Sequence, residues 1–225
     1  MGFAEQVLGW PCTGEQQKVV GIRTISLVGA AGCPGLVGAA LIAPVINYWW
    51  PSLPAKMSKA AYKQQPLGDQ WSLRVAHYLP WLTYWWNTQK LFPSSNVIAR
   101  NPVIYSAPDL HIFKTKLLND HEREKIKQYV TQQGVFESQH REMKIGFGKW
   151  EFDPMELKNP FPNNEGSVHL WQGEEDRLVP VTLQRYVANK LAWIHYHEVP
   201  GEGHLLARNK GMGEAIIKEL LVIRD

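Results

Sequence analysis

Asp176 and His204 are the two residues whose types and surroundings best fit catalytic chemistry in this chain. Each follows a short apolar run and lies in a glycine-containing turn, with Gly173 before Asp176 and with Gly201 and Gly203 before His204. An acid beside a histidine fixes the tautomer of the imidazole and leaves its second ring nitrogen to accept a proton. The two residues therefore predict an acid–base pair, if the fold brings their turns together.

The chain between these turns predicts a fold that would do so. The apolar runs at 168–172 and 194–199 are typical of buried strands. Pro180 suits the first turn of a helix, and the residues that then recur at helical spacing are Leu183, Tyr186, Val187, Lys190 and Leu191. A strand, a helix and a strand predict a parallel crossover. The carboxyl ends of both strands then meet at one edge of the sheet, where open α/β sheets place their ligands.

Both turns resemble motifs of the α/β-hydrolase family. The family's Gly-x-x-Asp-x-x-Val-Pro turn matches Gly173–Pro180, and its Gly-x-Gly-His turn matches Gly201–His204, in the family order of acid before histidine. Phrases at Pro44–Pro51, Tyr84–Thr88 and Trp150–Pro154 resemble a group of plant members. The alternative interpretation is a pair of ordinary turns, in which Asp and Gly are common. The resemblance implies the α/β class, as a partial α/β-hydrolase fold with a mostly parallel sheet and an inserted helical cap.

The family chemistry implied by this resemblance is ester or acyl hydrolysis of the Ser-His-Asp type. His204 would act as general base and then as general acid, and Asp176 would fix its tautomer. The implied substrate is a small hydrophobic ester or acyl compound, and no cofactor is expected. The resemblance also implies that the chain is shortened at its N-terminus and lacks the early strands of the family.

The nucleophile is the part of the family pattern that the sequence does not supply. Lys18–Gly21 resembles the strand that leads into the family's Gly-x-Ser-x-Gly elbow, but Arg23 stands at the position of the serine and Ile25 at that of the second glycine. A β-branched residue does not readily take the backbone geometry that glycine supplies there. The nucleophile therefore stays unknown, and whether the chain is an enzyme stays open.

Other candidates for the nucleophile fit less well. Cys33 lies in a similar small-residue pattern, but the following Pro34 has no N–H to donate to an oxyanion. Thr24 and Ser26 lack flanking glycines.

Three regions are predicted from these motifs. Residues 1–47 would be a divergent N-terminal part of the hydrolase core, with the elbow strand and the next strand. Residues 48–150 would be a Trp-rich helical cap, and residues 151–225 the C-terminal part of the core with the acid and histidine turns. The cap tryptophans proposed to contact substrate are Trp49, Trp50, Trp85 and Trp86. Packing within the cap is the alternative role for them, and the two roles are compatible.

Composition excludes several other classes of function. A hydrophobic content of 44% and a charged content of 20% are ordinary for a globular protein, and no basic arm suggests nucleic-acid binding. The two cysteines have no metal-ligand or disulfide spacing, and His195 and His197, which share one face of a strand, lack further ligands. The sequence therefore predicts no metal site.

The sequence gives weaker indications about membrane association and cellular location than about the class of function. Residues 24–55 carry no charge and are long enough to span a bilayer, but Pro34 and many small residues count against a span. Membrane association is therefore possible but not favoured. The chain starts without the basic and apolar regions of a signal peptide, so an intracellular location is the default.

Three hypotheses follow. The chain is a divergent α/β-hydrolase-family protein without activity, or a working hydrolase with another nucleophile. The third hypothesis is a non-catalytic binding module, membrane-associated or not, that uses the aromatic cap.

Overall fold

The computed structural model describes residues 6–7, 16–22, 25–31, 38–99, 101–115, 134–163 and 166–221. The chain divides into two compact units. The first unit combines Met1–Pro44 with Leu157–Asp225, and the second is Val45–Glu156, which includes residues 48–150. Asp176 and His204 both belong to the first unit, so their geometry depends on that unit alone.

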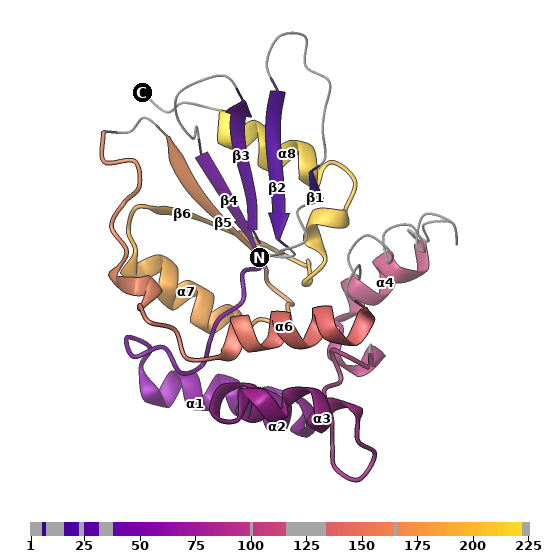
Figure 1. Cartoon of the computed structure of the whole chain (residues 1–225). Helices are drawn as coiled ribbons and strands as arrows, with labels where there is room; N and C mark the ends of the chain where they lie inside the picture. Colours follow the sequence, from indigo (N-terminus) through magenta and orange to yellow (C-terminus); the bar gives the residue numbers. More distant parts are fainter. Residues whose placement is uncertain are drawn as a thin grey trace. The chain divides into compact units, whose positions relative to one another are not determined.

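A six-stranded sheet forms the centre of the first unit, with the order β1-β2-β3-β4-β5-β6 (Figure 1). Its strands are β1 (Gln6–Val7), β2 (Gln16–Ile22), β3 (Ile25–Ala31), β4 (Gly38–Ile42), β5 (Ser167–Gly173) and β6 (Ile194–Val199). The strands β4, β5 and β6 are parallel, whereas the pairs from β1 to β4 are antiparallel. The α/β class predicted from the sequence is confirmed, and the parallel part of the sheet consists of β4, β5 and β6.

The strands β2 and β3 form an antiparallel hairpin. Ile22 lies opposite Ile25, and Gln16 lies opposite Ala31. The family elbow is a turn from a strand into a helix, whereas β2 is followed by an antiparallel strand. The strand expected at Lys18–Gly21 lies within β2, but its setting differs from that of an elbow strand. An apolar run of this length predicts a strand without fixing its partner or direction.

The crossover predicted between Asp176 and His204 is confirmed. Helix α7 (Val181–Lys190) connects β5 to β6 and begins directly after Pro180. Leu183, Val187 and Leu191 are buried, which explains their helical spacing in the sequence.

A polar contact also joins α7 to β6. The Arg185 guanidinium donates to Glu198 at 2.8 Å, and the Tyr196 hydroxyl donates to the same carboxylate at 2.8 Å. The hydrogen bond from Arg185 is the main reason that the pKa of Glu198 lies below its ordinary value. Burial raises the pKa of Tyr196 above its usual range, and the bond to Glu198 raises it further.

Helix α8 (Met212–Leu221) covers one face of the sheet. Its Ile216 and Leu220 are buried in an apolar cluster with Ala40 of β4 and Trp171 of β5. Side chains alternate between the two faces of a strand, so residues two positions from Trp171 along β5 also point toward α8. His169 is one of these residues.

The second unit is helical (Figure 1). Its α-helices within the described residues are α1 (Ala55–Gln64), α2 (Leu67–Tyr78), α3 (Thr83–Thr88), α4 (Ala107–Thr115) and α6 (Val135–Phe147). Short 3-10 turns lie at Pro80–Leu82, Pro102–Ile104 and Pro154–Glu156, and another, in the first unit, at Leu206–Arg208. Prolines start several of these helices, because proline fits a first turn but not a helix interior.

Two expectations about helices can be compared with this unit. The exposed helix expected at residues 121–133 lies outside the described residues. Within the described part of the chain, no helix combines the length and the apolar character that crossing a bilayer requires.

Asp153 joins the two ends of the second unit. Its carboxylate accepts hydrogen bonds from the backbone N–H of Ser52 at 2.7 Å and of Met155 at 3.0 Å. Burial alone would raise the pKa of Asp153, but these backbone donors outweigh it and hold the pKa below its ordinary value of 3.8. The charged carboxylate therefore stabilises the folded unit.

We expect this contribution to be lost in acid. A carboxyl whose pKa is lower in the folded chain contributes stability above its unfolded pKa and loses it as the pH falls through the folded pKa. The free energy of unfolding should therefore decrease between about pH 4 and pH 2. Asp153→Asn should be less stable at neutral pH by about 1–3 kcal/mol and should lose less in acid.

Denaturant unfolding followed by tryptophan fluorescence measures this effect, because most of the ten tryptophans lie in the second unit. Glu151→Gln is the matched control, since Glu151 is exposed and lies two residues away. The control should keep the pH profile of the unsubstituted chain. Equal pH profiles for Asp153→Asn and the control would contradict the assigned role of Asp153.

Candidate active site

The carboxyl ends of β5 and β6 bring Asp176 and His204 together. Gly173 lies opposite Val199 in the parallel ladder, so the two strands end at the same level. The Nδ1 atom of His204 lies 3.0 Å from Oδ2 of Asp176, at hydrogen-bond distance. The contact engages Nδ1, so Nε2 is the ring nitrogen that could exchange a proton with a reacting group.

The carboxylate of Asp176 is held by donors on both oxygens. Oδ1 accepts the backbone N–H of Leu178 at 2.8 Å and of Val179 at 3.0 Å. Oδ2 accepts the side-chain amide of Gln172 at 2.9 Å in addition to His204. The Asp176 side chain is completely buried. These contacts fix the plane of the carboxylate and thereby the orientation of the imidazole.

Gln172 is a positioning residue that the sequence did not single out. It is fully buried at the end of β5, next to Gly173. The sequence does place an uncharged polar side chain inside an otherwise apolar run. This pattern could have indicated a positioning role, because a buried amide requires a hydrogen-bond partner. The nearby Asp176 is that partner.

Backbone contacts lock the two turns to each other. The N–H of Glu174 donates to the carbonyl of Val199 at 3.1 Å, and that of Glu175 to the carbonyl of Glu202 at 2.8 Å. Gly201 has a φ of 69°, a left-handed conformation that glycine adopts without strain. Glycine at position 201 therefore has a conformational reason that is independent of catalysis.

Exposure differs between the two partners in a way that suits acid–base chemistry. The side chain of His204 is 22% exposed, whereas that of Asp176 is 0% exposed. A reacting group can reach the imidazole, and the carboxylate behind it stays out of contact with water. The pair can accept and return a proton, but it contains no nucleophile. Arg23, at the expected nucleophile position, lies outside the described residues.

The four tryptophans proposed for substrate binding fall into two groups in the second unit. Trp49 and Trp50 line an open hollow of about 440 Å³, together with Tyr62 and the cationic Lys59 and Arg74. Burial raises the pKa of Tyr62 to about 12, against the opposing charge of Arg74.

Several of these tryptophans also pack within the second unit. Trp49 stacks on His77 at 4.3 Å, and the buried Trp50 lies against Trp150. Trp85 and Trp86 are not among the described residues that line the hollow. Trp86 stacks instead on Phe92 with ring centroids 5.5 Å apart. The ring of Trp85 also contacts that of Trp86, with centroids 6.5 Å apart. Packing contacts are therefore observed for all four, and the binding role stays a prediction.

Comparison with known proteins gives little further information. No family model matches the chain, and no curated protein matches it. One solved structure that it resembles is MGS-M2, an alpha/beta hydrolase enzyme from a Medee basin deep-sea metagenome library, with 17% sequence identity and a TM-score of 0.38. The match covers 82% of this chain and 53% of that one, so the chain spans about half the length of that structure. A likeness of this size does not indicate a function for this chain.

Gly173→Ala tests the close approach of the two turns. A Cβ at Gly173 would lie 2.3 Å from the carbonyl oxygen of Gly203 and 2.5 Å from that of Glu202. These are backbone atoms, so the turn that precedes His204 would have to move. We expect the free energy of unfolding to fall by about 1–3 kcal/mol and the contact between His204 and Asp176 to be lost.

Denaturant unfolding and the imidazole ¹⁵N resonances of His204 measure the two effects. Gly213→Ala is the matched control, because Gly213 lies in α8 and an added Cβ meets nothing within 4 Å. The control should be neutral or stabilising by up to about 1 kcal/mol, since Ala is the better helix former. If Gly173→Ala matched the control in both measurements, the glycine would not be needed for the approach.

Proposed function

We propose that this chain carries the acid–base pair of an ester or acyl hydrolase of the Ser-His-Asp type on an α/β-hydrolase-like scaffold, and that it does not turn over esters by itself. The contact between His204 and the buried Asp176 is the observation that carries the proposal. The order of the two motifs and the parallel crossover between them support it.

The proposed roles follow from the geometry. Asp176 fixes the imidazole of His204 so that Nε2 faces the reacting group, and it stabilises the imidazolium that forms when Nε2 takes a proton. In a complete site that proton comes from a serine hydroxyl as it attacks the ester carbonyl. It is then given to the departing alkoxide.

The nucleophile is what limits activity. At the position that the sequence resemblance assigns to it, Arg23 offers a guanidinium, which stays protonated and donates hydrogen bonds but cannot attack a carbonyl. Without a nucleophile, binding and orientation leave only a small fraction of the full rate.

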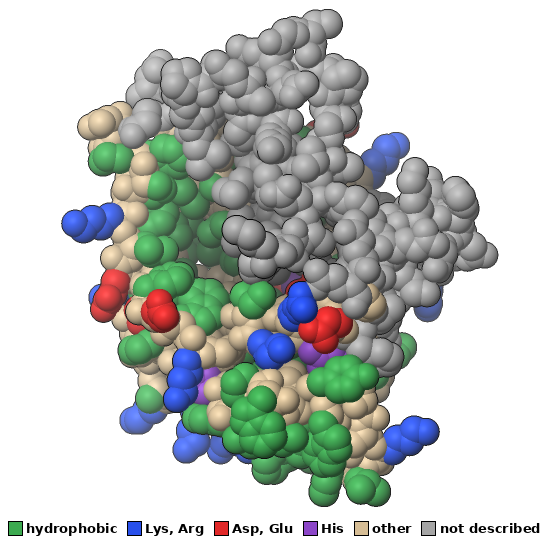
Figure 2. Space-filling model, in the orientation of Figure 1, with side chains coloured by type: hydrophobic (Ala, Val, Ile, Leu, Met, Phe, Trp, Pro, Cys, Tyr) green, Lys and Arg blue, Asp and Glu red, His purple; other side chains and the backbone are tan. Residues whose placement is uncertain are grey.

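A second function, binding without catalysis, is favoured by the aromatic surface of the second unit. The hollow beside Trp49 and Trp50 is lined by aromatic side chains together with the cationic Lys59 and Arg74, so it offers both apolar surface and positive charge to a ligand. Figure 2 also shows hydrophobic side chains gathered over the helices labelled α2 and α3 in Figure 1. Exposed large hydrophobic residues in and next to these helices are Leu67, Trp81, Tyr84, Trp85, Leu91 and Phe92. The ligand class would be a small hydrophobic ester or acyl compound.

The first test of the proposal is a comparison of the chain with its His204→Ala variant on short nitrophenyl esters. We expect equal initial rates, because removing the base has no effect where no nucleophile uses it. Labelling with a fluorophosphonate should also fail, since that probe requires an activated serine.

The matched control is His111→Ala, which removes an exposed histidine on α4 and corrects for hydrolysis by surface imidazoles. A rate that depends on His204 and not on His111 would refute the proposal and indicate a different nucleophile. Saturable binding of a non-hydrolysable ester analogue, abolished by Trp49→Ala and kept in His204→Ala, would support binding without catalysis.

The second test asks whether the nucleophile can be restored. We expect Arg23→Ser to leave ester hydrolysis at the level of the His204→Ala variant. A serine alone does not rebuild a strand-to-helix elbow, because β2 and β3 on either side are paired antiparallel, with Ile22 opposite Ile25. Steady-state kinetics measures this, and His204-dependent hydrolysis by Arg23→Ser would show that the elbow geometry is present after all.

A further inference from the structure

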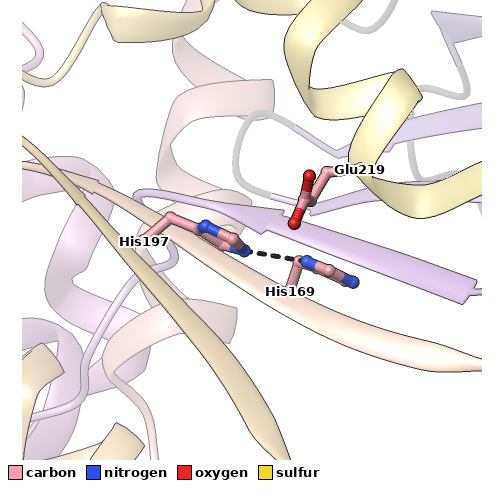
Figure 3. A group of neighbouring side chains, drawn as sticks. All are labelled: His169, His197 and Glu219. Atoms are coloured by element: carbon pink, nitrogen blue, oxygen red, sulfur yellow. Dashed lines mark hydrogen bonds between the residues drawn. The ribbon is translucent and has the colours of Figure 1, made fainter. Parts of the chain in front are cut away.

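Two histidines and a glutamate, none of them part of the candidate acid–base pair, converge in the first unit (Figure 3). His169 belongs to β5, His197 to β6 and Glu219 to α8. One ligand atom from each lies within 4.8 Å of the other two. These residues are contributed by three elements that are distant in the sequence and packed together in the first unit.

The strand register produces the pair of imidazoles. His169 lies opposite His195, and Trp171 lies opposite His197, so all four side chains occupy the face of the sheet that α8 covers. The Nδ1 atom of His169 and the Nε2 atom of His197 are 2.8 Å apart. In Figure 3 the carboxylate of Glu219 is directed toward this pair.

Neighbouring groups fix the orientation of both rings. The Oγ atom of Ser167 lies 2.8 Å from Nε2 of His169, and this hydroxyl can accept a hydrogen bond from Nε2–H, which would leave the lone pair of Nδ1 for an ion. A ligating histidine usually has its other nitrogen bonded in this way. The ring of Trp171 stacks on His197 with centroids 4.0 Å apart and planes 10° apart.

The burial of His169 beside apolar side chains also favours the binding of an ion. His169 is only 2% exposed, and Trp171, Ile216 and Leu220 form an apolar cluster on the same face. An apolar surrounding excludes water and lowers the local dielectric, which strengthens the binding of a cation by its ligands.

We propose that Nδ1 of His169, Nε2 of His197 and a carboxylate oxygen of Glu219 bind a divalent transition metal ion, for which Zn²⁺ is the best-fitting probe. Two imidazoles and a carboxylate are a ligand set that Zn²⁺ takes in proteins, whereas Ca²⁺ and Mg²⁺ prefer oxygen ligands. Tetrahedral coordination places two nitrogens about 3.3 Å apart, so the 2.8 Å pair needs to separate by about half an ångström.

The ion would tie α8 to the sheet. Two ligands lie on neighbouring strands and the third on the helix, so coordination links elements that otherwise meet through apolar contacts. The site is independent of the proposed acid–base function, since neither Asp176 nor His204 takes part in it.

The test uses the tag-free chain, stripped of metal with a chelator and titrated with Zn²⁺ alone. We expect one equivalent to bind by calorimetry and to remain after desalting, and the melting temperature to rise with Zn²⁺. Glu219→Gln should weaken binding by a factor of ten or more, whereas Glu214→Gln, an exposed position on the same helix, should not. Ser167→Ala should weaken binding about 10–100-fold, because Ser167 orients His169.

A second measurement needs no variant. Co²⁺ added to the unsubstituted chain should give the intense visible absorption of a four-coordinate site, and Zn²⁺ should abolish it. Absence of this absorption, or Zn²⁺ affinity that is equal in Glu219→Gln and Glu214→Gln, would overturn the proposal. Both results are separate from ester hydrolysis and do not bear on the acid–base pair.

Discussion

The parallel backbone pairing of β5 with β6 is the interaction on which both sites of the first unit depend. It sets Val168 opposite Ile194 and Gly173 opposite Val199. Because side chains alternate along a strand, this register alone decides that His169 and His197 share a face. It also ends both strands at one level, which lets the turns of Asp176 and His204 meet. A slip of one residue would send the histidines to opposite faces and separate the turns.

The turn geometry adds a constraint that the ladder by itself does not impose. Carbonyl oxygens of Glu202 and Gly203 lie so close to the Cα of Gly173 that no side chain fits between them. Asp176 has a structural task in the same place, because it accepts the N–H groups of Leu178 and Val179, which would otherwise lack this partner in a buried turn. The motif thus has a folding role besides the proposed chemical one, which is why a contact between acid and histidine does not by itself establish turnover.

The sequence predicts a feature well when the residues that form it are close together in the chain. The crossover was predicted because its strands, helix and turns follow one another, and each has its own periodicity or turn residue. The hairpin of β2 and β3 was not predicted, because an apolar run such as Lys18–Gly21 does not specify the direction of the strand that pairs with it. The pairing of His197 with His169 and Glu219 also escaped prediction, because it requires the strand register and the rotation of α8. From the sequence alone, only His195 could be placed on the same face as His197.

Access to solvent decides what each histidine cluster can do. His204 stands at the end of a strand with 22% of its side chain exposed, so an organic substrate can reach it. His169 is 2% exposed beneath α8, so a group of that size cannot reach it without displacing the helix. Only a small ion can enter such a position, and only ligands that are held in place before it arrives bind it without a large cost in side-chain entropy. The stacking of Trp171 on His197 and the contact of Ser167 with His169 provide that order. One pair of strands therefore positions the proposed acid–base pair at its open end and the proposed cation site along its covered face.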